Sequence, residues 1–373
     1  MAVGVSRKIS AASARAHTRK SNQNSALRLP SGMFKTITVI LLVGLVAWAY
    51  QAIQPPPPKI CGTPGGPPVT APRVQLKDGR YLAYEEHGVP KGEAKYKVVF
   101  VHGFYSCRHD ASFFLPEKTA EELGIYLVSF DRAGYGESTP NPKRTLKSTA
   151  LDIEELADQL GLGSKFHVIG FSMGGQVIWT CLKYIPHRLA GATLVAPVAN
   201  YWWPGFPRNV SKEAYNQQLL RDQFAVGIAH YFPWLTYWWN TQKWLASSAV
   251  VKNPGIFNTA DKQLFPMLVE RIKSYSEYIT HQGEYHSLHS DLKIGFGKWE
   301  FDPTDLENPF PNNEASVHLW HGDDDLLVPV TLQRYIAGKL PWVNYHELKG
   351  AGHLLYYEGV PDAILKAALL GEK

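Results

Sequence analysis

The residues of this chain best suited to nucleophilic chemistry lie around Ser172, in the sequence Gly-Phe-Ser-Met-Gly at positions 170–174. An apolar run precedes them, of the kind that forms a strand buried on both faces, and a helical pattern follows. A turn this sharp from strand to helix strains the residue at its apex and leaves almost no space beside it, which explains Gly170 and Gly174. Ser172 is therefore expected to project from the turn, with the N–H groups of the helix N-terminus pointing at the group that it attacks.

Acyl transfer by serine also requires a general base, a carboxylate that orients the base, and N–H donors for the developing oxyanion. The candidate base is His353, in a glycine-rich loop at 350–353 after the last predicted strand. The candidate acid lies in the loop after the preceding strand, where Asp323, Asp324 and Asp325 are consecutive. Open α/β sheets place their ligands at the carboxyl ends of the strands, so these loops are expected to meet the serine.

Four motifs resemble those of the α/β-hydrolase family, in its capped form with a serine nucleophile. They are the G-x-S-x-G turn at 170–174, the His-Gly pair at 102–103, the D-R-x-G-x-G-x-S run at 131–138 and the final glycine-histidine loop at 350–353. Together with the order serine, aspartate, histidine along the chain, they extend the resemblance over about residues 73–373. It implies an α/β fold with a mostly parallel central sheet, flanking helices and an inserted helical cap.

The resemblance also assigns roles to the matching residues. It implies a catalytic triad of Ser172, His353 and Asp325, because the family's G-x-x-D loop selects the third aspartate of the run. Asp323 and Asp324 stay open as alternatives for the acid. Serine at the nucleophile position argues against epoxide and haloalkane hydrolases, in which the resemblance would place an aspartate there.

An oxyanion hole is implied in the same way. The backbone N–H of Met173, directly after the nucleophile, and that of Phe104, after the His-Gly pair, are the expected donors. His102 itself is expected to be structural. No cofactor and no metal are implied. The long cap and the tail that precedes it are similar to those of an uncharacterised, membrane-anchored plant branch of the family.

The elements that must position these residues alternate along the chain. Strands are expected at 98–101, 125–130, 166–169, 192–197, 317–320 and 345–348, after a hairpin at 74–84, and helices at 145–160, 330–338 and 361–370. Such alternation predicts a mainly parallel sheet with helices on both faces. Along the helix at 145–160, the acidic side chains are expected to form only its solvated face.

One region interrupts this alternation and is expected to form the helical cap. Residues 199–308 have no alternating strands, and thirteen aromatic residues fall from Tyr201 to Trp244. Some of these rings are expected to line the cleft between the cap and the core, because pockets form at such junctions. The core would then consist of residues 73–198 and 309–373.

The start of the chain has a different composition. Residues 1–35 carry seven basic side chains and no acid, and are expected to be a disordered tail. Residues 36–53 carry no charge and would make a helix of about 27 Å, close to the thickness of a bilayer core. They predict a single-pass membrane anchor with a cytosolic N-terminus, followed by a stiff, extended spacer over 54–72. A secretory signal, or a transit peptide for a chloroplast or mitochondrion, stays open as the alternative.

Charge and cysteine content exclude several other classes. The net charge is +5, and the tail alone contributes +7, so the other residues sum to −2 and carry no footprint of nucleic-acid binding. Three cysteines without C-x-x-C spacing do not indicate a disulfide framework or a zinc site. A histidine and acid cluster at 281–291 is expected to be a polar cap surface rather than a metal site. The oligomeric state cannot be inferred.

The sequence therefore predicts a serine hydrolase that cleaves a hydrophobic carboxylic ester or lipid-like substrate through an acyl-enzyme. The aromatic cap and the membrane anchor favour such a substrate, but only by analogy with the family. Thioesterase, C–C hydrolase and cofactor-free peroxidase chemistry would use the same residues. A slow or non-catalytic ligand receptor on the same fold is the alternative.

Overall fold

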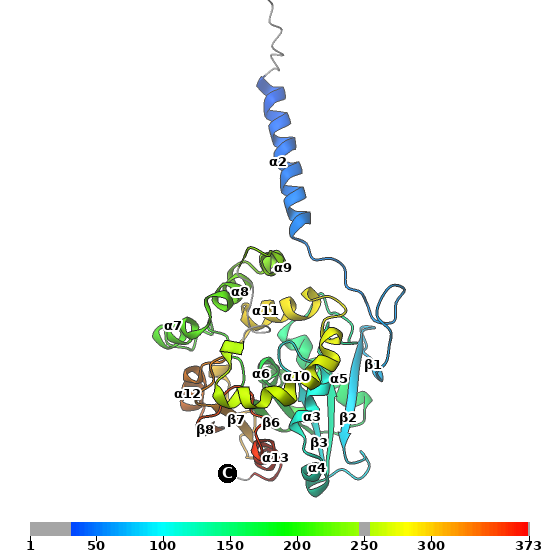
Figure 1. Ribbon diagram of the computed structural model, residues 1–373, viewed down its shortest axis with the longest axis vertical. Helices are drawn as coiled ribbons and strands as arrows, with labels where there is room; N and C mark the ends of the chain where they lie inside the picture. Colours follow the sequence, from blue (N-terminus) through cyan, green and yellow to red (C-terminus); the bar gives the residue numbers. More distant parts are fainter. Residues whose placement is uncertain (1–30, 246–253, 372–373) are drawn as a thin grey trace, which may run out of the picture. The chain divides into compact units, whose positions relative to one another are not determined.

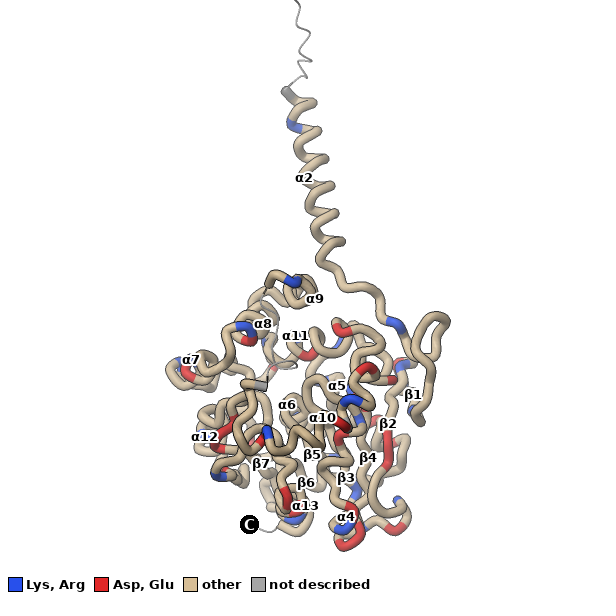
Figure 2. The backbone as a smooth tube through the Cα atoms, viewed as in Figure 1, with Lys and Arg blue, Asp and Glu red and all other residues tan. Residues whose placement is uncertain are grey.

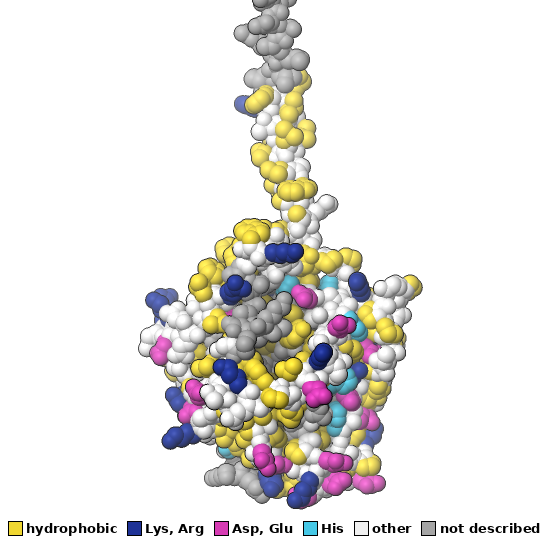
Figure 3. Space-filling model, in the orientation of Figure 1, with side chains coloured by type: hydrophobic (Ala, Val, Ile, Leu, Met, Phe, Trp, Pro, Cys, Tyr) yellow, Lys and Arg dark blue, Asp and Glu magenta, His cyan; other side chains and the backbone are white. Residues whose placement is uncertain are grey.

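The computed structural model describes residues 31–245 and 254–371 and divides into two units, Met1–Ala52 and Ile53–Lys373 (Figure 1). The predicted disordered tail covers residues 1–35, of which 1–30 lie outside the described residues. Helix α2 spans Ser31–Ile53, so it begins five residues before the predicted start, and the prediction of disorder is wrong for residues 31–35. Its only charged side chain is Lys35 (Figure 2), and most of its other side chains are apolar (Figure 3). By length and composition, this helix is able to cross a membrane.

An eight-stranded sheet forms the centre of the second unit, with the strand order β1-β2-β4-β3-β5-β6-β7-β8. The first two strands pair in antiparallel fashion, and the other six are parallel to one another. The strands are β1 Arg73–Gln75, β2 Tyr81–Gly88, β3 Tyr96–Val101, β4 Ile125–Phe130, β5 Phe166–Phe171, β6 Leu189–Val195, β7 Val317–Gly322 and β8 Val343–Leu348. The predicted α/β fold with a mainly parallel sheet is confirmed.

Helices pack on both faces of this sheet. They are α3 Ala111–Phe114, α4 Glu117–Leu123, α5 Leu146–Gln159, α6 Met173–Tyr184, α12 Val330–Lys339 and α13 Val360–Leu370. Alternate residues of β3 point to opposite faces, as the pleat requires. Val99 and Val101 join the core cluster of α5, α6 and α12, whereas Val98 and Phe100 join that of α3, α4 and α13.

The acidic face of α5 is not solvated along its whole length. Thr145 and Ser148 form a capping box at the start of this helix. Asp152, one turn further on, is buried and accepts two hydrogen bonds from the Arg80 guanidinium, at 2.6 and 3.0 Å. The prediction of a solvated face is therefore wrong for Asp152, because the hairpin brings an arginine over this part of the helix.

Between β6 and β7 the described residues form helices and connecting loops. The α-helices are α7 Arg208–Gln217, α8 Leu220–Tyr231, α9 Thr236–Thr241, α10 Thr259–Ile279 and α11 Ser290–Phe296, and a π-helix, η5, spans Tyr285–His289. The longest of these, α10, is capped by Asn258, whose side chain accepts a hydrogen bond from the backbone N–H of Asp261 at 2.8 Å.

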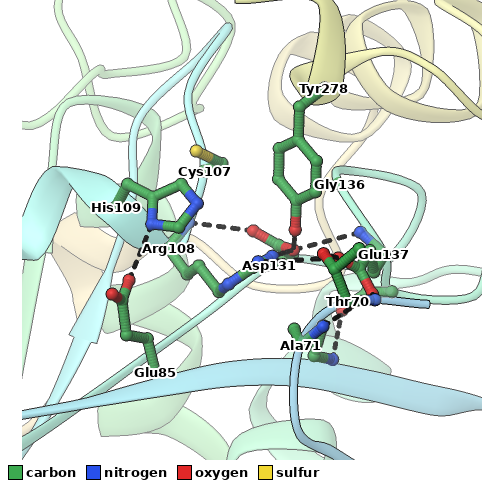
Figure 4. A network of polar contacts seen from close by, with 12 residues as sticks. Thr70, Ala71, Glu85, Cys107, Arg108, His109, Asp131, Gly136, Glu137 and Tyr278 are labelled. Atoms are coloured by element: carbon green, nitrogen blue, oxygen red, sulfur yellow. Dashed lines mark hydrogen bonds and ion pairs between the residues drawn. The ribbon is translucent and has the colours of Figure 1, made fainter. Parts of the chain in front are cut away.

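The linker before β1 packs against the globular unit instead of forming an extended spacer. The backbone N–H of Gly62 donates a hydrogen bond to the carbonyl oxygen of Pro67, at 2.8 Å, and this bond closes a turn. Cys61, just before the turn, is buried. Further on, the Glu137 carboxylate accepts hydrogen bonds from the backbone of Thr70 and Ala71 (Figure 4). The predicted spacer conformation is therefore wrong for these residues, because side chains far along the sequence satisfy the linker's polar groups.

The same network joins the cap to the core. In Figure 4, the buried Asp131 carboxylate accepts hydrogen bonds from Arg108, at 2.6 Å, and from the hydroxyl of Tyr278 on α10, at 2.5 Å. Asp131 is the first residue of the D-R-x-G-x-G-x-S run. This part of the motif therefore supports the packing of linker, core and cap.

Candidate active site

Ser172 lies at the turn between β5 and α6, with φ 54° and ψ −116°. This positive φ is unusual for a side-chain-bearing residue and marks local backbone strain. A Cβ atom added at Gly174 would lie 2.1 Å from the carbonyl oxygen of Val101, and one added at Gly170 would lie 2.4 Å from that of Gly174. Both positions therefore require glycine for the reason that the sequence suggests, namely close approach of the backbone.

The structure brings Ser172, His353 and Asp325 together from three different loops. His353 Nε2 lies 3.0 Å from Ser172 Oγ, and His353 Nδ1 lies 2.8 Å from Asp325 Oδ2. A neutral imidazole that donates its Nδ1–H to the carboxylate leaves Nε2 free to accept the serine proton. All three residues are buried, so this chain of hydrogen bonds is shielded from water.

The three consecutive aspartates have different partners. Only Asp325 faces His353, and its other oxygen accepts hydrogen bonds from the backbone N–H groups of Leu327 and Val328, at 2.9 and 2.8 Å. Asp323 accepts from the backbone of the glycine-rich loop, and Asp324 from the Asn258 amide at 3.0 Å. The first two aspartates thus hold neighbouring segments, while the third holds the histidine.

Electrostatic interactions keep Asp325 ionised and raise the pKa of His353. Burial alone would raise the pKa of Asp325, but His353 and His321 hold it far below its ordinary value. Burial alone would lower the pKa of His353, but the Asp325 carboxylate offsets this and holds it above its ordinary value. The carboxylate therefore favours the protonated form of the His353 imidazole.

Asp261, a residue that the sequence did not single out, holds the loop that carries His353. It is fully buried at the start of α10 and accepts hydrogen bonds from the backbone N–H of His353, at 2.9 Å, and of Leu354, at 2.8 Å. The Tyr357 hydroxyl donates a third, at 2.6 Å. The only local signal was an Asn-x-x-Asp pattern at a helix start, and it says nothing of a loop more than ninety residues away.

The loop after β3 is fixed against the serine by Arg132. This side chain donates to the carbonyl oxygens of His102, at 3.1 Å, and Gly103, at 2.7 Å. A Cβ atom added at Gly103 would lie 3.2 Å from that of Ser172, so the backbone leading to Phe104 passes directly beside the serine. Met173 begins α6 on the other side of it. The backbone of both predicted oxyanion donors therefore belongs to segments that adjoin Ser172.

Arg132 is itself held by the cap. Asp291, on α11, accepts two hydrogen bonds from its guanidinium, at 2.7 and 2.6 Å, and a third from the Tyr135 hydroxyl at 2.7 Å. Burial would raise the pKa of Asp291, but Arg132 and Arg144 lower it to about 2. Asp291 is thus buried, and the prediction of a polar surface is wrong for this residue, because its partners come from the core.

Two histidines of the 281–291 cluster also have structural partners. His281 lies 2.6 Å from the Gly136 carbonyl oxygen, and His286 lies 3.0 Å from that of Pro56. In the described part of the chain, no three or more histidine, cysteine or acidic side chains are grouped as a metal site would need.

A cavity of about 600 Å³ opens beside Ser172 and His353. One wall is formed by α10, and most of the lining is apolar: Phe113, Phe257, Phe265, Leu268, Ile272 and Leu354. None of the thirteen aromatic residues from 201 to 244 is among the described residues that line it. The expectation that some of them line the cleft is therefore wrong for this cavity, because α10 covers it and α7 to α9 pack elsewhere on the cap.

These observations define a class of protein. It has a hydrolase fold in which a buried serine, histidine and aspartate contact one another. The family model described as "alpha/beta hydrolase fold" matches residues 96–360, and the chain belongs to this family.

Curated relatives from plants and bacteria include a probable lysophospholipase and a lipase. Over 276 residues the chain is 21% identical to "Probable lysophospholipase BODYGUARD 2" of Arabidopsis thaliana, covering 72% of this chain and 56% of that protein. Over 140 residues it is 29% identical to "Lipase 1" of Psychrobacter immobilis, covering 37% of this chain and 41% of the lipase. The chain thus spans about half the length of the curated relatives that it matches, and the predicted resemblance to plant members of the family is confirmed.

Solved structures share the fold. A thermophilic esterase from Thermogutta terrifontis superposes with a TM-score of 0.54 at 24% identity, covering 79% of this chain and 97% of the esterase. An enol-lactonase from Burkholderia xenovorans LB400 gives a TM-score of 0.54 at 19% identity, covering 81% of this chain and all of the lactonase (100%). At these identities the likeness concerns the fold alone.

Proposed function

We propose that this protein is a serine hydrolase that cleaves a hydrophobic carboxylic ester, or a lipid-like ester, through an acyl-enzyme. The observation that carries the proposal is the continuous hydrogen-bond chain from Ser172 Oγ through His353 to Asp325, at 3.0 and 2.8 Å. Its position at the floor of a largely apolar cavity supports the choice of substrate.

In this mechanism, His353 Nε2 accepts the proton of Ser172 as the serine oxygen attacks the ester carbonyl. The Asp325 carboxylate stabilises the imidazolium, and the backbone N–H groups of Met173 and Phe104 donate to the oxyanion. When the tetrahedral intermediate collapses, the imidazolium gives its proton to the leaving alcohol and an ester to Ser172 remains. Water, deprotonated by His353, then attacks this ester and releases the acid.

The cavity and the relatives' names together favour an ester with one long apolar chain. The lining side chains of α10 and of the loop after His353 offer an apolar channel beside the nucleophile. The Arabidopsis relative is named a probable lysophospholipase, and the Psychrobacter relative a lipase. We therefore include monoacyl lipids in the proposed substrate class.

The proposed organisation has a basic tail over 1–35, a membrane anchor over 36–53, a linker over 54–72, a cap at 199–308, and a core at 73–198 and 309–373. Helix α2 supports the anchor, and the basic residues before it support a cytosolic N-terminus. Alkaline carbonate extraction tests the anchor: full-length protein should stay in the membrane pellet. Release into the supernatant, or a chain shortened by cleavage after α2, would replace the anchor with a targeting signal.

The catalytic proposal is tested by fluorophosphonate labelling of the detergent-solubilised full chain, beside assays with p-nitrophenyl esters of graded length. Ser172→Ala and His353→Ala should abolish labelling and turnover, whereas Ser164→Ala, at an exposed surface serine, should keep both. Folding of each variant is checked by circular dichroism. Folded wild-type protein that neither labels nor turns over would refute the hydrolase and leave the ligand receptor as the better account.

A further inference from the structure

Large apolar side chains lie exposed on cap helix α8 and on the segments before and after helix α9. The seven residues, named here the aromatic cap face, are each at least 37% exposed: Leu219, Leu220, Phe224, Tyr231, Phe232, Trp234 and Trp244. Figure 3 shows hydrophobic side chains gathered at the end of the globular unit where α9 lies. Scattered single apolar residues are normal on a protein surface, but a grouping this dense marks an interaction site.

Ring contacts join the aromatic cap face to the half-buried rings of helix α9. The rings of Phe224 on α8 and Trp239 on α9 lie 5.9 Å apart, and those of Trp238 and Trp244 lie 6.1 Å apart. Its composition of tryptophan, tyrosine, phenylalanine and leucine is that of segments that settle into the headgroup layer of a bilayer.

The charges on this face have a single sign. Among residues 219–245 the exposed charged side chains are Arg221 and Lys243, and the only carboxylate, Asp222, is buried (Figure 2). A face that combines exposed rings with cations and no exposed carboxylate complements an anionic lipid surface.

The chain enters the globular unit next to this face. His286, in the π-helix η5, donates to the carbonyl oxygen of Pro56 at 3.0 Å. Its neighbour Tyr285 contacts the ring of Tyr237 on α9, at 5.6 Å between ring centroids. Only two residues lie between Pro56 and Ile53, the last residue of α2, and this stretch of chain can span no more than about 10 Å.

We infer that the aromatic cap face docks into the headgroup layer of an anionic lipid bilayer. The inference goes beyond the proposed ester hydrolysis, and it rests on that proposal only for the membrane anchor. The face then serves as a second point of attachment to the lipid phase.

Nitroxide accessibility in the full chain tests this docking. The native cysteines Cys61, Cys107 and Cys181 are all buried, so a thiol-reactive spin label would attach at introduced cysteines. We would label Trp234→Cys in the cap face and Lys118→Cys on α4, whose side chain is 86% exposed, as the matched control. The protein is reconstituted into vesicles of phosphatidylcholine and phosphatidylglycerol, and collisions with oxygen and with a polar nickel chelate are measured.

Docking predicts that the label at position 234 collides several-fold more with oxygen, and several-fold less with the chelate, than the label at position 118. The double variant Arg221→Glu and Lys243→Glu should restore chelate access at position 234. Equal chelate access at both positions would overturn the inference. So would low access to both reagents with dipolar coupling between labels, which would mean that a second copy covers the face. Two further measurements on the same vesicles distinguish failed docking from other failures. Carbonate extraction shows whether the anchor holds the protein in the membrane, and ester turnover shows whether the enzyme is active.

Discussion

The carboxylate of Asp261 accepts a hydrogen bond from the backbone N–H of His353, with 2.9 Å between Oδ2 and N. The two residues belong to different parts of the fold, since Asp261 starts cap helix α10 and His353 follows the last strand of the sheet. The same carboxylate accepts from the backbone of Leu354. The loop of the proposed base is therefore fixed by the cap, and a displacement of α10 would disturb the base as well as the cavity wall.

Replacing Asp261 with asparagine should change the titration of His353. The negative charge of Asp261 contributes to the raised pKa of His353, although less than Asp325 does. Asp261→Asn should therefore move the acid limb of kcat/KM toward lower pH and lower kcat about tenfold.

The measurement is the pH profile of ester hydrolysis, with Asp305→Asn as the control, because its carboxylate is 65% exposed in a surface ion pair. A folded Asp261→Asn variant with an unmoved acid limb would show that this residue only supports the fold.

The wild-type enzyme should lose activity on acidification with a midpoint above 6.5. His353 must be neutral to accept the proton of Ser172, and its pKa is raised by Asp325, so protonation removes the base as the pH falls through that raised value. Asp325→Asn should lower this midpoint and reduce kcat by about 10⁴-fold, because the imidazole loses both its orienting partner and the stabilisation of its charged form. A profile of kcat/KM from pH 5 to 9 decides: a wild-type midpoint below 6.5 contradicts the assignment of the base.

Filling the cavity should shorten the preferred acyl chain. Leu268, on α10, lines the cavity and is nearly fully buried, so Leu268→Trp adds bulk where a long chain would lie. We expect kcat/KM for a dodecanoyl ester to fall by about 10- to 100-fold while that for an acetyl ester changes little.

Leu151→Trp is the matched control, since Leu151 is 42% exposed on α5. An equal loss for short and long esters in Leu268→Trp would mean that the acyl group lies elsewhere.

Features encoded by local sequence could be predicted, and those made by distant pairs could not. The turn at Ser172 was recognisable because strand, glycines and helix are contiguous, and the apolar strands were recognisable because they are buried on both faces. Asp325 was selected from three equivalent aspartates only through the family's loop pattern. Its geometry in the structure agrees with that choice.

The missed features all depend on tertiary partners. Asp152 looked solvated because a helical pattern does not show Arg80, which reaches it from the hairpin. The linker looked extended because its composition does not show Glu137 or the cap, which bind its backbone. Asp261 carried no signal, since its role arises from backbone N–H groups that every residue type possesses.

The buried pair of Arg132 and Asp291 should matter for both stability and activity. Asp291→Asn would leave Arg132 buried beside a neutral partner, and losing one member of such a pair costs about 3–5 kcal/mol. In contrast, Glu347→Gln removes an ion pair with Arg334 at the surface and should cost about 0–1 kcal/mol. Since folding lowers the pKa of Asp291 to about 2, its stabilising contribution is present at neutral pH and is lost as the pH falls through that value.

Urea denaturation of the two variants in the same detergent, at pH 7 and at pH 4, measures these differences. The deficit of Asp291→Asn should be nearly as large at pH 4 as at pH 7, because the contribution of Asp291 is lost only as the pH falls toward about 2. It should be accompanied by reduced kcat, because Arg132 also holds the carbonyl of Gly103 beside Ser172. Equal stability of the two variants at pH 7 would show that the buried pair is energetically neutral. An intact kcat in Asp291→Asn would show that the loop keeps its position without it.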